Sequence, residues 1–178
     1  FTVICLSDAV EVAQVIPIVA RTPGPFYVRL SRAATPVIHG PDYRFTLSRS
    51  EVARDGQDVT IIATGMMVYV ALEAAELLAQ EGVQARVVNM HTLKPVDEAS
   101  ILAAARETGA IVTAEEHYIH GGLGSIVGQV VGQHHPVPLE MVAITGYTGS
   151  GKGEELMKEC GLTPENLMEA AQRAVRRK

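Results

Sequence analysis

Two arginines in the string YVRLSR, Arg29 and Arg32, could bind an anionic ligand. They stand at the carboxyl end of the apolar run Phe26 to Leu30, which predicts a strand. Open α/β sheets bind ligands beyond the carboxyl ends of their strands, and a planar guanidinium matches phosphate or carboxylate. In an extended chain, residues three apart point to opposite sides. A salt bridge at a domain junction explains these arginines equally well.

The segment Gly146 to Gly153 reads GYTGSGKG and contains GxxxxGK, most of a P-loop, between a predicted strand and a predicted helix. Its backbone amides could form an anion-binding nest. However, Gly153 replaces the Ser or Thr that should follow Lys152 to hold magnesium, and few elements remain downstream to supply a Walker-B aspartate. A flexible turn that lines a cleft or an interface is therefore favoured over a nucleotide site.

A polar cluster from Glu115 to His120, reading EEHYIH, brings two carboxylates and two imidazoles into one loop. Such groups could ligate a metal or exchange protons. The zincin motif requires two histidines four residues apart on a helix, whereas His117 and His120 are three apart and precede Gly121-Gly122. The pattern favours an interface or helix-capping role over a metal site.

The other reactive side chains follow no catalytic pattern. His134 and His135 precede a proline at the predicted end of a helix, where exposed histidines are ordinary. No serine lies in a GxSxG string, so a hydrolase triad has no support. Cys5 and Cys160 are far apart and lack a CxxC spacing, which indicates neither a disulfide framework nor a zinc site.

The composition is that of an ordinary globular protein. Hydrophobic residues make up 47% of the 178 residues and charged residues 20%, with a formal net charge of -5. No overall positive field would attract nucleic acid or anionic lipid. The first twenty residues are apolar but include Asp8, Glu11 and Pro17, which predicts neither a signal peptide nor a membrane span. The bland interpretation is a soluble cytoplasmic protein.

The elements that position these groups are organised around Asp58 to Gly82. Val59 to Ile62 form a β-branched run without alternation of polarity, which predicts a strand buried on both faces of a parallel sheet. After Thr64-Gly65 the apolar period becomes that of an amphipathic helix, which Gly82 ends. A buried strand that leads into a helix needs a second parallel strand, so the sequence predicts a layered α/β fold.

Strand and helix patterns alternate through the rest of the chain. Asp97 is the expected N-cap and Gly109 the expected end of one helix, and Thr163-Pro164 starts the last one. Two short edge strands, Phe45 to Leu47 and Glu51 to Ala53, are expected before the central unit. The other predicted segments are strands Ala85 to Met90, Ala110 to Ala114 and Met141 to Ile144, loops His91 to Pro95 and Glu115 to Gly121, a helix from Leu123, and a short helix ending at Cys160.

The beginning of the chain reads as strand, helix, strand, a unit too small to stand alone. Asp8 is the expected N-cap of the helix with Glu11 as its capping-box partner, and Pro17 should kink or end the helix near Ile16. Because Phe1 is not a methionine, further residues are expected before it. We predict that residues 1–32 end one α/β domain, that 33–44 form a linker, and that 45–178 form a second, three-layer α/β/α domain.

Five strings taken together resemble the C-terminal section of transketolase, and the resemblance is strongest to the split, two-subunit kind. They are YVRLSR, DVTIIATG, HTLKP, EEHYIHGGLGS and the glycine loop followed by a helix that starts at GLT. The resemblance runs from about residue 3 to the C-terminus. More remotely, the chain resembles deoxyxylulose-phosphate synthase and the beta subunits of pyruvate dehydrogenase.

This resemblance implies a thiamine diphosphate enzyme of the pentose phosphate pathway with three α/β domains. The last domain would have a mixed five-stranded sheet with one antiparallel strand. The enzyme would be a homodimer, or a heterotetramer with a transketolase N-terminal subunit. Thiamine diphosphate and Mg²⁺ would be held upstream or by the partner chain. No catalytic, cofactor-binding or metal-binding residue is therefore assigned to this chain.

One position, Arg32, matches a family residue of direct function, since the arginine that ends the RLSR-like strand resembles a contact for the substrate phosphate. The glycine loop differs from the family, because Tyr147 to Gly151 reads YTGSG where an FGESG-like string is usual. Its family role is therefore not transferred.

The sequence is interpreted as the C-terminal part of a transketolase, which moves a two-carbon ketol unit between sugar phosphates. Three alternatives stay open. One is the corresponding part of deoxyxylulose-phosphate synthase or of a 2-oxoacid dehydrogenase beta subunit. The second is a non-catalytic module for dimerisation or regulation. The third is a nucleotide-binding protein that uses Gly146 to Lys152.

Overall fold

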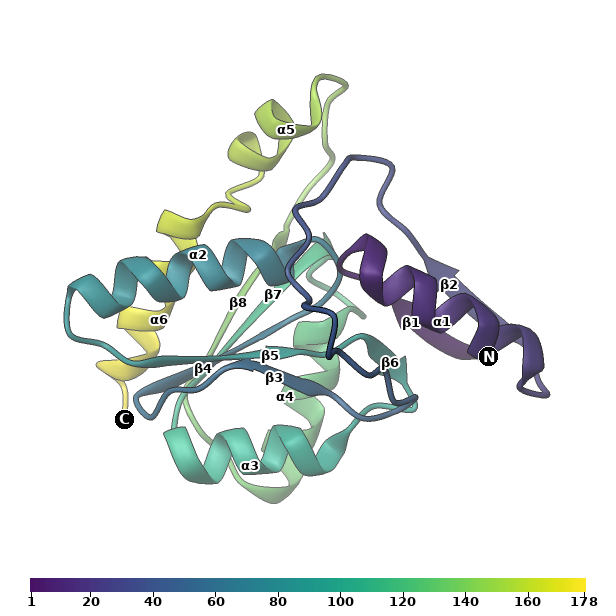
Figure 1. Cartoon of the computed structure of the whole chain (residues 1–178). Helices are drawn as coiled ribbons and strands as arrows, with labels where there is room; N and C mark the ends of the chain where they lie inside the picture. The colour runs from purple at the N-terminus through teal and green to yellow at the C-terminus, as the bar shows by residue number, and fades with distance from the viewer.

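The computed structural model describes all 178 residues, Phe1 to Lys178. Its helices and strands are arranged around two sheets, one of three strands and one of five (Figure 1). In chain order the elements are β1 Thr2–Cys5, α1 Ala9–Arg21, β2 Phe26–Arg29, β3 Glu51–Arg54, β4 Val59–Ala63, α2 Met67–Gln80, β5 Ala85–Asn89, β6 Thr92–Lys94, α3 Glu98–Thr108, β7 Ile111–Tyr118, α4 Leu123–His134, β8 Leu139–Ile144, α5 Gly153–Glu159 and α6 Pro164–Val175.

The unit of β4 and α2 forms the centre of the five-stranded sheet, as predicted. Every residue of β4 is buried, because strands pair with it on both sides and helices cover both of its faces. Gly65 and Gly82 flank α2, and both have positive φ, 59° and 82°. Glycine adopts this conformation without the steric cost that a side chain adds, so it ends one element and turns the chain toward the next.

The order of the five-stranded sheet is β3-β5-β4-β7-β8, with β3 antiparallel to β5 and the other pairs parallel. Helices α2 and α6 cover one face in a core cluster of 20 buried residues, and α3 and α4 cover the other in a cluster of 11. The result is the three-layer α/β/α arrangement that the sequence predicts, with one antiparallel edge strand.

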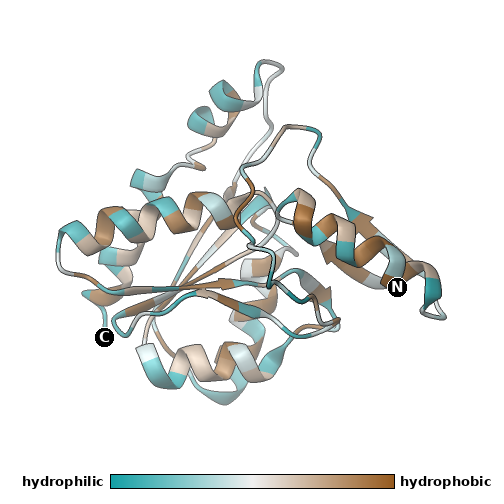
Figure 2. Ribbon diagram, viewed as in Figure 1, coloured by the Kyte–Doolittle hydropathy of each residue, from teal (hydrophilic) through white to brown (hydrophobic).

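The three-stranded sheet combines the beginning of the chain with a strand from its middle. β1 pairs in parallel with β2 on one side and antiparallel with β6 on the other. Helix α1 packs on one face of this sheet through a small cluster that includes Ile4, Val15 and Phe45. In Figure 2, β1 and β2 are strongly hydrophobic, whereas α5 and the loop before it are hydrophilic and project from the body of the molecule.

Two local predictions differ from the structure. Of the kink or end predicted near Ile16, the end is wrong, because α1 continues to Arg21 with Pro17 inside it, and the kink stays a prediction; Pro17 and Ala13, four residues before it, are both exposed. Phe45 to Leu47 form no strand, because the Phe45 ring packs 4.3 Å from the His91 ring and its amide bonds to Gln14.

Two predicted loops contain strand. The loop His91 to Pro95 contains β6, which finds its partner in β1 far away in the sequence. β7 continues through the polar residues to Tyr118, where it still pairs with Ile144 of β8. The pairing with β8 is interrupted at residues 115–117 and resumes at Tyr118, so the strand continues through the polar residues by means of a register shift.

The predicted capping of α1 is confirmed in part. Asp8 caps the helix by accepting from the Glu11 amide at 2.8 Å. The Glu11 carboxylate does not accept from the Asp8 amide, as a capping box requires. It accepts instead from the amide and the hydroxyl of Ser7, both at 2.8 Å. The predicted N-caps Asp97 and Thr163 and the predicted helix end at Gly109 are confirmed.

The division into residues 1–32, 33–44 and 45–178 stays a prediction. No helix or strand lies between Arg29 and Glu51, which is consistent with a linker. Yet β6, from the second predicted domain, completes the sheet of the first. None of the helices has the length and apolar character that crossing a membrane requires.

Candidate functional site

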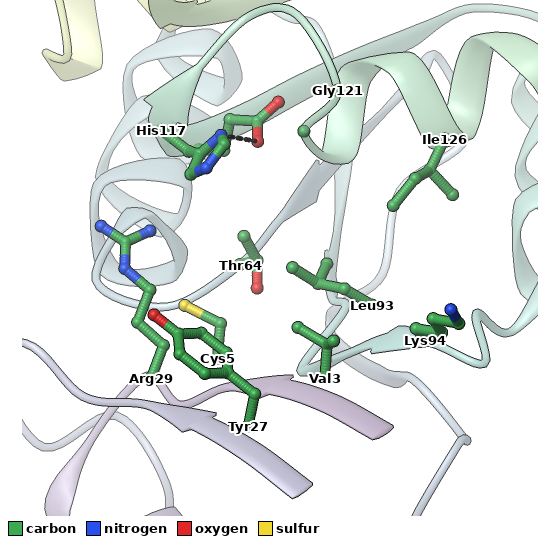
Figure 3. Close-up of a pocket in the computed structure, with 12 residues that line it drawn as sticks. Val3, Cys5, Tyr27, Arg29, Thr64, Leu93, Lys94, His117, Gly121 and Ile126 are labelled. Atoms are coloured by element: carbon green, nitrogen blue, oxygen red, sulfur yellow. Dashed lines mark ion pairs between the residues drawn. The ribbon is translucent and has the colours of Figure 1, made fainter. Parts of the chain in front are cut away.

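Two cavities open at the ends of β1, β2, β4 and β7, where the two sheets meet. The first, which we call the junction cavity, has a volume of about 440 Å³ and lies between the three-stranded sheet and the start of α4. Thr64 and Cys5 lie deep in it, with Arg29 and His117 on one side and Leu93 and Lys94 on the other (Figure 3). The other cavity surrounds Arg32.

Cys5 and Thr64 form the inner wall of the junction cavity. Burial raises the pKa of the Cys5 thiol, and the nearby Arg29 guanidinium only partly offsets this effect. The thiol is therefore protonated and weakly nucleophilic at neutral pH. Gly65 allows the close approach, since a Cβ at this position would lie 2.6 Å from Cys5 Sγ.

The Glu115 side chain caps the N-terminus of helix α4. It is buried, and its two carboxylate oxygens accept from the amides of Leu123 at 2.7 Å and Gly124 at 2.8 Å. Burial raises the pKa of this carboxyl, while the two amide bonds lower it. Of the roles considered for the EEHYIH cluster, helix capping is the one that the structure gives to Glu115.

The two histidines of the cluster lie on the surface. His117 Nδ1 lies 4.0 Å from Glu115 Oε2, and His120 is exposed. No group of three or more His, Cys, Asp or Glu side chains anywhere in the chain is arranged to hold a metal ion. The residues present therefore do not fit a magnesium diphosphate group, and we derive no reaction step through one on this chain.

Arg29 and Arg32 occupy different surroundings. Arg29 Nη2 donates to the backbone carbonyl of Glu116 at 2.6 Å and to its carboxylate at 3.2 Å, so Arg29 forms the salt bridge that the sequence left as one alternative. Arg32 is exposed and makes no ion pair. The two guanidinium groups line separate cavities, as expected for positions three apart in an extended segment.

The second cavity, the Arg32 cavity, has a volume of about 900 Å³. Its walls come from the segment after β2, the start of α2, and the glycine loop with α5, and Glu116 lies on its border. Lys152 of the loop lines the same cavity as Arg32. The structure thus joins two features that are separate in the sequence. Three carboxylates, Glu116, Glu154 and Glu155, line the cavity as well, so its lining is not positive overall. Any attraction for an anion would therefore come locally from Arg32 and Lys152, neither of which forms an ion pair.

Sequence reasoning missed a buried polar network near the site. Glu11 is fully buried and accepts from the Tyr43 hydroxyl at 2.6 Å and from Asn89 Nδ2 at 2.9 Å. His39, also buried, contacts the carboxylates of Asp8 and Glu51. The capping pattern at Asp8 and Glu11 was the only local signal of this network. The rest of the network could not be predicted, because the tertiary partners of these two residues are 30 to 78 positions away along the chain.

The fold and the site define a class: a three-layer α/β domain with cavities at the carboxyl ends of parallel strands, where open α/β sheets bind ligands. Residues 48–167 match the family described as "Transketolase, C-terminal domain". The chain belongs to this family.

Curated relatives agree with the assignment. The chain is 41% identical over 172 residues to the 6-deoxy-6-sulfo-D-fructose transketolase subunit SqwH of Clostridium sp. (strain MSTE9), covering 96% of this chain and 53% of the relative. It is 39% identical over 166 residues to an apulose-4-phosphate transketolase subunit of Phocaeicola vulgatus, covering 92% and 53%. The chain therefore spans about half the length of these relatives.

A solved structure shows the same fold at high similarity. A split-gene transketolase, described as an inactive beta4 tetramer, superimposes with a TM-score of 0.96 at 41% identity. The match covers 99% of this chain and 58% of that one. The resemblance inferred from the five sequence strings is confirmed.

Proposed function

We propose that this chain is the C-terminal part of a two-subunit transketolase that transfers a two-carbon ketol unit between sugar phosphates. The observation that carries the proposal is the identity with transketolase subunits along nearly the whole chain. That both relatives are named as transketolase subunits favours this interpretation over deoxyxylulose-phosphate synthase or a 2-oxoacid dehydrogenase beta subunit. We expect a cytoplasmic enzyme that is either a homodimer or a heterotetramer with a transketolase N-terminal subunit.

The cofactor of the proposed enzyme is thiamine diphosphate with Mg²⁺, held by polypeptide outside this chain. When bound, the thiazolium supplies the electron sink that stabilises the carbanion of the two-carbon unit. The contribution we assign to this chain is substrate binding, through Arg32. It also supplies a scaffold that holds the end of β2 against the five-stranded sheet.

Arg32 is proposed to bind the anionic end of the substrate. Its guanidinium lies in the Arg32 cavity without a salt-bridge partner, so it is available for bidentate bonds to a tetrahedral oxyanion. The names of the relatives include both a sulfo sugar and a sugar phosphate. A guanidinium can bind either group, and a phosphate dianion attracts it more strongly than a sulfonate monoanion.

The test is a steady-state assay of the assembled enzyme with Arg32→Ala. The transition state of a phosphorylated substrate should lose about 1.5 to 3 kcal/mol, seen mainly as a higher KM. An unphosphorylated ketol donor should be affected little. The isolated 178-residue polypeptide, assayed with thiamine diphosphate and magnesium, serves as the blank and should be inactive. Ketol transfer by the blank, or an unchanged KM in the variant, would contradict the proposal.

Two rival functions lead to different results. A pure dimerisation or regulatory module should pair unaided, which equilibrium sedimentation with and without the upstream half would detect. A nucleotide-binding protein should release heat on titration with ATP and magnesium and lose this signal in Lys152→Ala. Within the transketolase proposal no heat from ATP is expected. Unaided pairing alone does not exclude that proposal, because the similar split-gene transketolase is described as a beta4 tetramer; a dimerisation or regulatory module would in addition leave the assembled protein without ketol transfer.

A further inference from the structure

The end of β7 directs its two glutamates to different places. The pairing of β7 with β8 shifts register between Ala114 and Tyr118. Glu115 turns inward to cap α4, and Glu116 reaches Arg29 on β2. Glu115 and Glu116 are neighbours in β7 and point to opposite sides, so one carboxylate caps α4 while the other reaches β2.

The Arg29–Glu116 contact ties β2 to β7 at two points. One guanidinium nitrogen donates to the carbonyl oxygen at 2.6 Å and to the carboxylate at 3.2 Å. The side chains are 31% and 39% exposed, so the ion pair adds only about 0 to 1 kcal/mol to folding stability. Its importance therefore lies in where it holds the end of β2.

Arg32 follows this tie by three residues. Between them, Ser31 Oγ accepts from the Ala33 amide at 3.1 Å and lies 3.9 Å from Met66 Sδ at the start of α2. The segment that carries Arg32 is thus held at Arg29 by β7 and at Ser31 by its own turn. Arg32 itself is exposed and contributes no anchoring bond. Its direction depends on these neighbours.

We propose that the Arg29–Glu116 bridge is a positioning device that aims Arg32 at the anionic end of the substrate. The inference rests on the proposed function of Arg32. A long guanidinium side chain gains bidentate bonds only if its backbone holds it in the correct place, and a displacement of about 1 Å can cost about a hundredfold in rate. Glu116 and Arg29 are positioning residues, because Arg32 makes the contact.

Substituting Glu116→Gln removes the ion pair with Arg29 but leaves the bond to the backbone carbonyl of residue 116, so it tests the part of the positioning that the carboxylate charge supplies. Glu116 lines the Arg32 cavity, so removal of its negative charge would by Coulomb attraction alone favour an anion there. Loss of positioning has the opposite sign. We expect the KM of a phosphorylated donor to rise about three- to tenfold with kcat nearly unchanged, and the KM of an unphosphorylated donor to stay constant.

Two further variants of the assembled enzyme serve as controls. Glu107→Gln breaks the ion pair with Arg86, which joins α3 to β5 away from both cavities, and should leave all constants unchanged. The charge swap of Arg29→Glu with Glu116→Arg can restore the ion pair but not the bond to the backbone carbonyl of residue 116, so it should recover only part of the lost affinity. A thermal melt of each variant shows whether it folds. If one of the single variants fails to fold, the double variant is compared with the wild type in its place.

Calorimetric titration of the assembled enzyme with ribose 5-phosphate measures substrate binding without the need for turnover. Weaker binding in Glu116→Gln, with Glu107→Gln unchanged, supports the inference even if the wild type transfers no ketol unit, in which case the proposed function alone fails. Unchanged or tighter binding in Glu116→Gln overturns the inference while leaving the proposed function standing. Unchanged binding in Arg32→Ala overturns the inference, because Arg32 would then make no contact with the ligand and its position would not matter.

Discussion

At the scale of single residues, His39 shows how a buried charge is kept. Its Nδ1 lies 3.0 Å from Asp8 Oδ2 and its Nε2 lies 2.8 Å from Glu51 Oε2. Burial alone would lower the pKa of the imidazole, but the two carboxylates outweigh it and raise the pKa to about 9. The imidazolium therefore joins the start of α1 to β3 at neutral pH.

This raised pKa predicts a pH dependence of stability. Since the folded pKa of His39 exceeds its ordinary value of 6.5, its contribution is complete below pH 6.5 and is lost as pH rises through about 9. The free energy of unfolding of the wild type should fall toward that of His39→Gln across this window. Urea denaturation at several pH values measures it.

A constant difference between the two proteins from pH 6.5 to 9 would contradict this prediction. The contribution of Asp8 to stability depends on pH in the opposite direction. Burial raises the pKa of its carboxyl, but the hydrogen bonds that it accepts bring the pKa below 3.8. Its contribution is present above that value and is lost on acidification. A scan that stays above about pH 5 avoids the titration of Asp8, and the comparison with His39→Gln removes the effect of other groups whose pKa changes on folding, such as His91.

At the scale of elements, the start of α4 depends on a glycine without a side chain. A Cβ on Gly122 would overlap the Glu115 carboxylate that caps the helix. Gly122→Ala should therefore destabilise the protein by about 1 to 3 kcal/mol, through overpacking and loss of the cap. Chemical denaturation of the purified protein gives this value.

The same helix supplies the control. Gly132 lies inside α4, and a Cβ added there would meet no atom within 4 Å, so Gly132→Ala should be neutral or should stabilise by up to about 1 kcal/mol. If both substitutions had the same effect, steric overlap with Glu115 would not be the cause.

At the scale of the whole molecule, several contacts join the two sheets. β6 pairs with β1 across the boundary, and Glu11 of α1 accepts from Asn89 of β5 and from Tyr43. Burial and the adjacent carboxylate raise the pKa of Tyr43, so its hydroxyl stays a donor at all physiological pH values. Contacts of this kind couple the unfolding of the two sheets.

We therefore expect a single unfolding transition that circular dichroism and calorimetry report at the same temperature. Tyr43→Phe should lower it by the equivalent of about 1 to 3 kcal/mol, because a buried carboxylate oxygen loses a donor. Tyr27→Phe, which changes a 57% exposed tyrosine, should have little effect. Two separate transitions would show that the sheets unfold independently.

Much of the fold follows from local sequence signals, and the exceptions share a cause. The buried β-branched run of β4, the helix that follows it and the caps at Asp97 and Thr163 are set by nearby residues, and these predictions are confirmed. β6, the extension of β7 and the unbroken α1 were missed. The two strands depend on pairing with parts of the chain that are distant in the sequence, and the continuation of α1 past Pro17 depends on which side of the helix faces solvent.

The sequence by itself determined the fold class and the family, because hydrophobic period, caps and five short strings are local properties. It also identified Arg29 and Arg32 as candidates, but it did not decide which of them binds an anion and which forms a salt bridge. Only the tertiary structure decided that Arg29 is bound by Glu116 while Arg32 shares a cavity with Lys152. The physical reason is that partners 87 positions apart along the chain meet only when the sheets close.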